Sequence, residues 1–380
     1  MHDGPTLGCD VVKRPTDATD HMYTVIYVMG YGRSGSTILD ILLNQHPDVL
    51  SGGEVGELYR WLGASETCAC HAPIRDCAFW RAVSEQHFAA CTDALTRMAA
   101  LQRSIESLRN FPALLLSVNG RRRVEEYRRQ VRSLFGSMAL VSGRRWIVDS
   151  SKSAHHYTGR ALALERYAGL DVRAIHLVRD PRAVGWSMMR GEGSPERQTR
   201  VHRPRLSFVR ALGGWTVTNA LACVTARRLR RGALRVRYED LCVNPGAVLQ
   251  GIGEFVGLDV SEVIRTLEDG ASLQVGHNIA GNRIRFQRRL AFRPDEEWRE
   301  KLPGSYRRAA RMATWPLCEM LGYREPASAE RPTGGTKVAP SSPPRSPRTR
   351  GDAHVPVEVA ESLGQDPGII ARETSLPMRR

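Results

Sequence analysis

The stretch GYGRSGST, residues 30–37, constrains the fold of this chain more than any other feature. The apolar, β-branched run YTVIYVM (23–29) precedes it, and STILDILLNQ (36–45), with apolar residues at helical spacing, follows it. A strand, a glycine loop and a helix in this order bind anions, because free backbone N–H groups and the positive end of the helix dipole meet there. The sequence therefore predicts an α/β fold with an anion-binding loop.

The loop differs from a P-loop at one decisive position. A P-loop has a lysine and then Ser or Thr after its last glycine, whereas Gly35 is followed directly by Ser36 and Thr37. The positive charge is Arg33, inside the loop, whose forked donors suit phosphate or sulfate oxygens. We therefore expect an adenine nucleotide to place its 5′-phosphate end against Arg33, Ser34, Gly35, Ser36 and Thr37.

Three further segments have the composition of short strands: RWIVDSS (145–151), VRAIHLVRD (172–180) and ALRVRYEDL (233–241). Because helical segments separate them, we expect a P-loop-like central parallel β-sheet flanked by helices. Ligands bind beyond the carboxyl ends of the strands in such sheets. The polar motifs at residues 30–37, 149–153 and 179–187 occupy those ends.

The chain divides into one domain and two polar ends. Residues of about 60–140 contain amphipathic helical patterns without strand signals, which indicates a helical insertion. Residues 1–20 are polar and aperiodic, and residues 325–380 are rich in Pro, Ser, Gly and Arg, so both ends are expected to be disordered. We therefore predict a single domain over residues 21–324.

Charge and hydropathy limit the kinds of molecule that this protein is expected to bind. The 380 residues carry a formal net charge of +15, which favours anionic partners such as nucleic acid, acidic lipid or a multiply phosphorylated ligand. No nucleic-acid motif or aromatic-plus-basic platform is present in the sequence, so we expect no nucleic-acid partner. No run reaches the length of a membrane span, and the N-terminus lacks the apolar core of a signal peptide. We therefore predict a cytoplasmic protein without a transmembrane segment.

Three of the eight cysteines cluster in ETCACHAPIRDC, where Cys68, Cys70 and Cys77 accompany His71. A cytoplasmic location argues against a disulfide framework. A zinc site built from these four residues is conceivable, although their spacing is not that of a common zinc finger. We favour packed or reactive thiols and predict no metal requirement.

Two motifs together resemble those of the sulfotransferases that use 3′-phosphoadenosine 5′-phosphosulfate (PAPS). YGRSGSTIL looks like their 5′-phosphosulfate loop, with Arg33 in the place of the family's basic residue. HLVRDPRAVGWSMMR looks like their 3′-phosphate motif, in which an arginine at the end of a strand and a serine eight residues later bind the phosphate; Arg179 and Ser187 have this spacing. The resemblance spans roughly residues 23–323 and implies PAPS as the co-substrate.

The catalytic base is expected in HPDVLSGGEVGEL, where a short turn with two glycines returns Glu54 toward the loop. Tyrosylprotein sulfotransferases have a similar arrangement, with their catalytic glutamate at the matching position. Lys152, in DSSKSAHH, and Arg33 could both stabilise the charge that develops during transfer. Because other sulfotransferases use a histidine base, His46 and His71 are the alternatives.

A late basic segment, HNIAGNRIRF (277–286), resembles the loop with which family members close over the nucleotide, and Arg285 is its best candidate contact. The usual Arg-Lys-Gly signature is absent. The resemblance implies a hydroxyl-bearing acceptor: a carbohydrate, a glycolipid, a small alcohol or phenol, or a peptide tyrosine.

Three other functions stay open from the sequence: a degenerate, inactive PAPS binder, a P-loop-type kinase or hydrolase, and a nucleic-acid-binding protein. A P-loop-type kinase or hydrolase is suggested by WIVDSS, which resembles a strand that ends in a magnesium-binding Asp149; the missing lysine argues against it. A nucleic-acid-binding protein is suggested by the charge and would bind with a steep salt dependence. We expect a PAPS-dependent sulfotransferase that acts by in-line displacement.

Overall fold

In the computed structural model, the part of the chain that the structure describes is residues 23–323, apart from residues 65, 91–94, 154–155, 192–202 and 288–293. The two ends predicted to be disordered, 1–20 and 325–380, lie outside the described residues. The limits of the predicted domain stay a prediction.

A five-stranded sheet forms the centre, with the strand order β2-β3-β1-β4-β5 and every neighbouring pair parallel. The strands are β1 (Thr24–Met29), β2 (Val49–Ser51), β3 (Trp146–Asp149), β4 (Asp171–Val178) and β5 (Ala233–Arg237). The predicted α/β fold with a parallel sheet is confirmed. The sequence had indicated four of these strands; β2 has only three residues, too few to show a periodic pattern.

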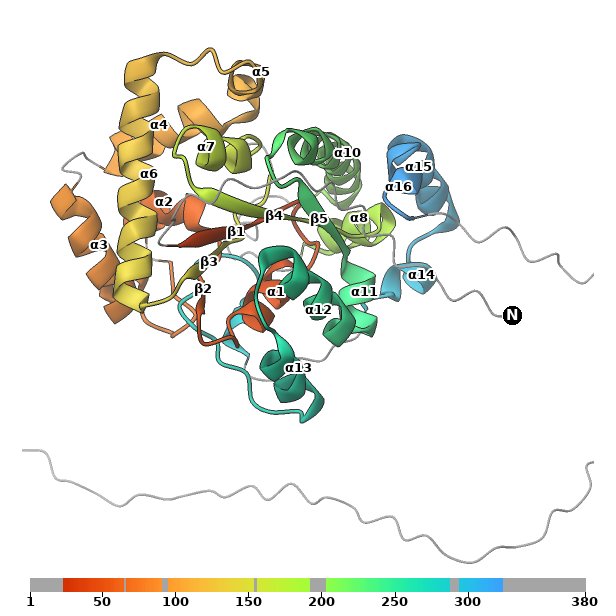
Figure 1. Ribbon diagram of the computed structural model, residues 1–380. Helices are drawn as coiled ribbons and strands as arrows, with labels where there is room; N and C mark the ends of the chain where they lie inside the picture. Colours follow the sequence, from red (N-terminus) through yellow and green to blue (C-terminus); the bar gives the residue numbers. More distant parts are fainter. Residues whose placement is uncertain are drawn as a thin grey trace, which may run out of the picture. The chain divides into compact units, whose positions relative to one another are not determined.

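Helices cover both faces of the sheet, as Figure 1 shows with α1, α12 and α13 on one side and α6, α7 and α10 on the other. The odd residues of β1, such as Tyr27, pack in one hydrophobic cluster with Phe135 of α6, and the even residues, such as Val28, pack in a second with Leu249 of α12. Burial on both faces explains why β1 is a continuous apolar run and does not alternate.

The helices before β3 are α1 (Ser36–Leu43), α2 (Leu58–Leu62), α3 (Ala78–Ala90), α4 (Leu95–Glu106), α5 (Phe111–Leu115) and α6 (Arg121–Ser142). Those that follow are α7 (Arg160–Arg166), α8 (Pro181–Arg190), α10 (Pro204–Arg228), α11 (Tyr238–Val243), α12 (Pro245–Val256), α13 (Ser261–Glu268), α14 (Glu297–Lys301), α15 (Gly304–Thr314) and α16 (Leu317–Met320). Helices α2 to α6 thus lie between β2 and β3, within the region where a helical insertion was expected. Among the described residues, no helix is both long and apolar enough to cross a membrane; the cytoplasmic location stays a prediction.

The helix α8 begins at the residue that the sequence indicated. Pro181 occupies its first turn, where a missing N–H costs nothing, and the Asp180 side chain accepts a hydrogen bond from the Arg182 amide at 2.8 Å. This cap fixes the point at which the chain leaves β4 and enters the helix that carries Ser187.

The strand order reverses its direction beside β1. After β1 the chain crosses to β2 and β3 on one side, and β4 then pairs with the other side of β1. In open α/β sheets, ligands bind beyond the carboxyl ends of the strands at such a reversal. The loop after β1 and the turn after β4 lie at these ends, and they contain the two motifs that the sequence singled out.

Candidate functional site

The loop between β1 and α1 lies tightly against its neighbours. Gly30 has a φ of 127°, and a Cβ there would lie 2.2 Å from the Leu177 carbonyl oxygen. Gly35 has a φ of 92°, and a Cβ there would lie 2.5 Å from the Tyr238 ring. Only glycine combines these backbone angles with this lack of space, so the loop is held between β4 and α11.

The two motifs predicted to bind opposite ends of one nucleotide are in direct contact. Arg33 Nε donates a hydrogen bond to Ser187 Oγ at 2.9 Å, and Arg179 Nη1 donates to the Arg33 carbonyl oxygen at 3.0 Å. Arg33 itself has a φ of 70°, a left-handed conformation that is uncommon for a residue other than glycine. The structure therefore brings Arg33, Arg179 and Ser187 together beyond the carboxyl ends of β1 and β4.

Arg179 is buried in a setting that leaves part of its donor capacity unused. Its guanidinium stacks on Tyr238 at 4.4 Å and pairs with the Asp295 carboxylate at 3.2 Å, and its carbonyl accepts from Trp215 Nε1 at 2.9 Å. Arg179 Nε and Ser34 Oγ are buried without a hydrogen-bond partner among the described residues. A buried donor without a hydrogen-bond partner costs folding free energy. An anionic oxygen of a ligand could accept hydrogen bonds from both of these donors. The residues present thus fit a phosphorylated ligand.

Glu54 and Lys152 form an ion pair on the same edge of the sheet, and both side chains are largely shielded from solvent. Glu54 follows β2, and its amide donates to the Ile279 carbonyl at 3.0 Å. A Cβ placed on Gly281 would lie 2.9 Å from Thr37 Oγ1 and 3.9 Å from Glu54 Oε1. The carboxylate therefore lies beside the end of the loop, where the path of the chain was expected to return it.

The late segment borders the loop through its backbone. Asn282 N donates to Thr37 Oγ1 at 3.1 Å, and Ile279 N donates to the Gly52 carbonyl at 3.1 Å. Arg285, in contrast, forms an ion pair with Glu66 and donates to the carbonyl oxygens of Thr67 and Gly281, each at 3.1 Å. These contacts attach the segment to the protein, and a contact of Arg285 with the nucleotide stays a prediction.

A buried ionic network supports the loops on which Glu54 and Lys152 lie. Arg160 Nε donates to Asp149 at 2.7 Å and its Nη1 pairs with Glu106. Asp149 also accepts from the amide and hydroxyl of Ser151, and Ser151 Oγ accepts from the Gly56 amide at 2.8 Å. The Asp149 carboxylate is thus engaged by an arginine and a serine, which disfavours the magnesium role that a kinase would give it.

Asp40, on the buried side of α1, is a site residue that the sequence reasoning missed. It accepts hydrogen bonds from Ser150 Oγ at 2.6 Å and Ser51 Oγ at 3.1 Å. Burial raises the pKa of its carboxyl to about 7, and the neighbouring charge of Lys152 partly opposes the shift, whereas that of Glu54 adds to it. Asp40 is the one charged residue in the apolar run ILDILL, and this position could have indicated a buried carboxylate from the sequence.

The histidines proposed as alternative bases have other surroundings. His46 accepts a hydrogen bond from the Asp48 amide at 3.1 Å in the turn after α1. His71 is exposed and packs against Phe286 with ring centroids 5.1 Å apart and planes tilted by 31°. The four-residue metal set considered from the sequence needs a correction: the histidine beside the three cysteines is His277 and not His71. The loop CACHAP turns His71 outward, with a φ of 71°.

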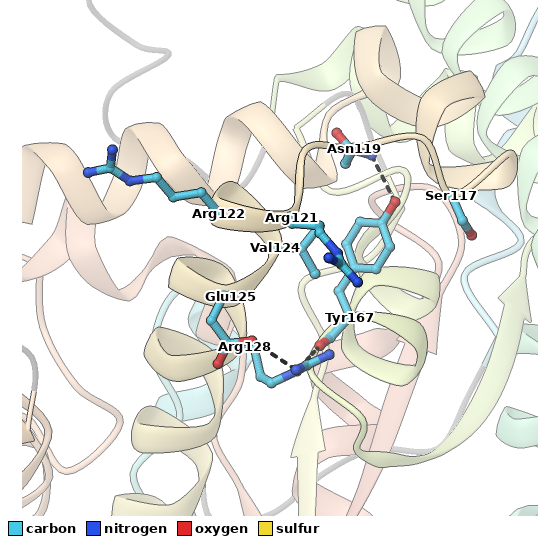
Figure 2. Close-up of a pocket in the computed structure, with 8 residues that line it drawn as sticks. All are labelled: Ser117, Asn119, Arg121, Arg122, Val124, Glu125, Arg128 and Tyr167. Carbon is cyan, nitrogen blue, oxygen red and sulfur yellow. Dashed lines mark hydrogen bonds and ion pairs between the residues drawn. The ribbon is translucent and has the colours of Figure 1, made fainter.

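The larger of two hollows on the described part of the surface is lined by none of these residues. Figure 2 shows it between the start of α6 and the end of α7, where Tyr167 accepts hydrogen bonds from Asn119 and Arg128, each at 2.9 Å. Its volume is about 610 Å³, and no predicted site residue lines it. The smaller, of about 170 Å³, adjoins the turn after Glu54 and includes Gly56 and His156.

Comparison with known proteins identifies the family. A model of the sulfotransferase family matches residues 26–262. The chain belongs to the sulfotransferase family. This confirms the resemblance noted in the sequence and makes the protein a transferase of sulfuryl groups. A search of curated proteins found no match.

Three solved structures are similar to this sulfotransferase. The sulfotransferase domain of the olefin synthase of Synechococcus PCC 7002 is 21% identical with a TM-score of 0.47, over 82% of this chain and 100% of that domain. The sulfotransferase domain of the curacin biosynthetic pathway is 18% identical with a TM-score of 0.48, over 81% of this chain and 100% of that domain. A sulfotransferase of Mycobacterium avium is 16% identical with a TM-score of 0.39, over 66% of this chain and 68% of that chain.

Proposed function

We propose that this sulfotransferase uses PAPS as its donor and a hydroxyl group as its acceptor. The observation that carries the proposal is the direct contact between the glycine loop and the turn after β4, with Arg33 bonded to Ser187 and Arg179 bonded to Arg33. The buried, unpaired donors of Ser34 and Arg179 lie on these same two segments. A ligand with anionic groups at both ends would satisfy both segments at once.

The loop would hold the 5′-phosphosulfate end of the donor, because residues 30–37 present backbone amides at the start of α1. Arg179 and Ser187 would hold the 3′-phosphate, for which a guanidinium is well suited. Arg179 now pairs with Asp295, so a bound phosphate would compete with that carboxylate for the same cation.

Glu54 would act as the general base. Its carboxylate would take the proton of the acceptor hydroxyl as the acceptor oxygen bonds to sulfur and the sulfur–oxygen bond to the 5′-phosphate breaks. The products are a sulfate ester and 3′-phosphoadenosine 5′-phosphate, and in-line geometry keeps the entering and leaving oxygens on opposite sides of sulfur. Lys152, already paired with Glu54, and Arg33 would stabilise the charge on the leaving oxygen. The transfer itself requires no metal.

The acceptor would approach through the smaller hollow, which borders the turn after Glu54. Its volume of about 170 Å³ is below the roughly 300–1,000 Å³ of pockets that enclose a whole drug-sized ligand. It would admit a single hydroxyl-bearing group, such as one sugar unit, a phenol or a tyrosine side chain, while the rest of the acceptor stays outside. The position of Glu54 resembles that of the tyrosylprotein sulfotransferases.

The deciding experiment is a calorimetric titration with 3′-phosphoadenosine 5′-phosphate. We expect Arg179→Ala to weaken binding about 10- to 150-fold and Ser187→Ala about 2- to 10-fold, since charged hydrogen bonds contribute more than neutral ones. Arg81→Ala, which removes an exposed arginine of α3, is the matched control and should bind as the wild type does. Equal affinity for all four proteins would show that the 3′-phosphate lies elsewhere.

A further inference from the structure

Three cysteines and one histidine from distant parts of the chain meet near the turn that carries Glu54. Their ligand atoms, the Sγ atoms of Cys68, Cys70 and Cys77 and a ring nitrogen of His277, all lie within 4.8 Å of one another. Cys70 Sγ is 3.6 Å from Cys77 Sγ, and His277 Nδ1 is 3.3 Å from Cys77 Sγ and 3.9 Å from Cys68 Sγ. The four groups thus converge on one point.

The three separations of 3.3, 3.6 and 3.9 Å are close to the edges of a tetrahedron around zinc. With Zn–S bonds of about 2.3 Å and a Zn–N bond of about 2.0–2.1 Å, sulfurs lie about 3.8 Å apart and sulfur lies about 3.5 Å from nitrogen. The three cysteines are free thiols here, since the Sγ atoms of Cys70 and Cys77, 3.6 Å apart, lie beyond a disulfide bond length of about 2.05 Å. Three thiolates and one imidazole form one of the common structural zinc sets.

The surrounding contacts fix the orientation of the four groups. His277 stacks on Phe79 with ring centroids 5.0 Å apart and planes 16° apart, and its carbonyl accepts from Trp80 Nε1 at 2.7 Å. A tight turn places Cys68 and Cys70 side by side, since the Cys68 amide donates to the Ala72 carbonyl at 2.8 Å. A ligand set that is oriented before the ion binds is typical of metal centres.

We propose that Cys68, Cys70, Cys77 and His277 bind one structural zinc ion. Four protein ligands close the coordination sphere and leave no position for substrate, as in structural sites and unlike catalytic ones. The sequence analysis favoured packed thiols and no metal requirement, and the proposed zinc site revises that expectation. The zinc ion would have a structural role only and would take no part in the sulfuryl transfer. Cys70 is exposed, which leaves a path for the ion to enter.

The ion would attach the late segment to the site. Beyond His277, the Asn278 carbonyl accepts a hydrogen bond from the Ala69 amide at 3.0 Å. The Ile279 backbone forms hydrogen bonds with Gly52 and Glu54, the two neighbours of Gly53. The next residues reach Thr37 at the end of the loop. Zinc would therefore hold residues 277–282 against the turn of Glu54, across about two hundred residues of sequence.

The test measures metal content in the full-length protein grown with zinc. We expect one zinc per chain by mass spectrometry, and a visible spectrum typical of tetrahedral thiolate coordination after exchange with cobalt(II). Cys70→Ser and His277→Gln should each lose most of the zinc, whereas Cys223→Ser, in α10 and outside the cluster, should keep it. Removal of zinc with a chelator should lower the melting temperature of the wild type.

Three outcomes would overturn the proposal. One is a wild-type protein that holds less than about a tenth of an equivalent of zinc. Another is a disulfide between Cys70 and Cys77, detected by the mass of the protein after thiol alkylation. The third is zinc that persists in both Cys70→Ser and His277→Gln. The wild-type measurement needs no variant, so the proposal can be tested even where a substituted chain fails to fold. Because the readout is zinc, it is independent of whether the nucleotide binds as proposed.

Discussion

Replacing Arg160 by methionine tests the buried network beneath the site. The side chain of Arg160 is 2% exposed, and those of its two partners, Asp149 and Glu106, are 0% exposed. Methionine retains much of the volume and removes the charge, so two carboxylates would stay buried without their cation. Breaking a buried pair by removing one partner costs about 3–5 kcal/mol, which is at least about a fifth of a typical folding free energy of about 5–15 kcal/mol.

The assay is urea unfolding followed by tryptophan fluorescence and circular dichroism. Arg122→Met, at an arginine whose side chain is 91% exposed in α6, is the matched control and should change the unfolding free energy by less than about 0.5 kcal/mol. Adding Glu106→Gln to Arg160→Met should recover about 0.5–3 kcal/mol, because one of the two unpaired charges is then gone.

The refuting result is equally definite. If Arg160→Met unfolds at the same urea concentration as Arg122→Met, the network does not hold the loops after β2 and β3, and Asp149 is free for another role. The loss should also shrink as the pH falls, because a buried carboxylate can then take up a proton. A loss that does not change with pH would indicate a packing defect.

Two further predictions concern the carboxylates of the site. Glu54→Gln should lower turnover about 10²- to 10⁴-fold in a sulfate-transfer assay, with nucleotide affinity unchanged by calorimetry, while Glu57→Gln retains turnover; full activity of Glu54→Gln would remove it as the base. Asp40 has a folded-state pKa of about 7 against about 3.9 when unfolded, so the folded state binds the extra proton and the contribution of Asp40 to stability should fall as the pH rises from about 4 to 7, by at most about 1.4 kcal/mol per pH unit. His87 and His176, whose pKa burial lowers to about 4, contribute a slope of the opposite sign. Asp40→Asn should remove that slope in urea unfolding at a series of pH values, and an unchanged slope would contradict the assignment.

Local patterns were enough to predict the fold around the loop. Residues 23–45 contain a strand, a glycine loop and a helix in sequence, and each signal lies within a few positions of the next. The spacing of Arg179 and Ser187 is local in the same way. Strand β2 was not predicted, because Val49–Ser51 pairs with β3 through contacts almost a hundred residues away and its own three residues carry no pattern.

The ion pairs within the candidate site were harder to predict, because each charged side chain has more than one possible partner and the fold decides between them. A bond between Lys152 and Asp149 was plausible from their proximity in sequence, but Arg160 engages Asp149 and Lys152 pairs with Glu54. In the same way, His71 is next to Cys70 in the chain, yet His277 lies beside the cysteines in space. Neither choice has a signal in the local sequence.

The bridge between Gly53 and Ile279 has a consequence for how this protein can be dissected. The region that matches the family model stops at residue 262, whereas Glu54 and Thr37 are bonded to backbone groups of Ile279 and Asn282. A fragment trimmed to the shared family region would keep the loop and Glu54 but lose the strip of chain that contacts both. Domain boundaries drawn from sequence similarity alone would therefore cut through the candidate site.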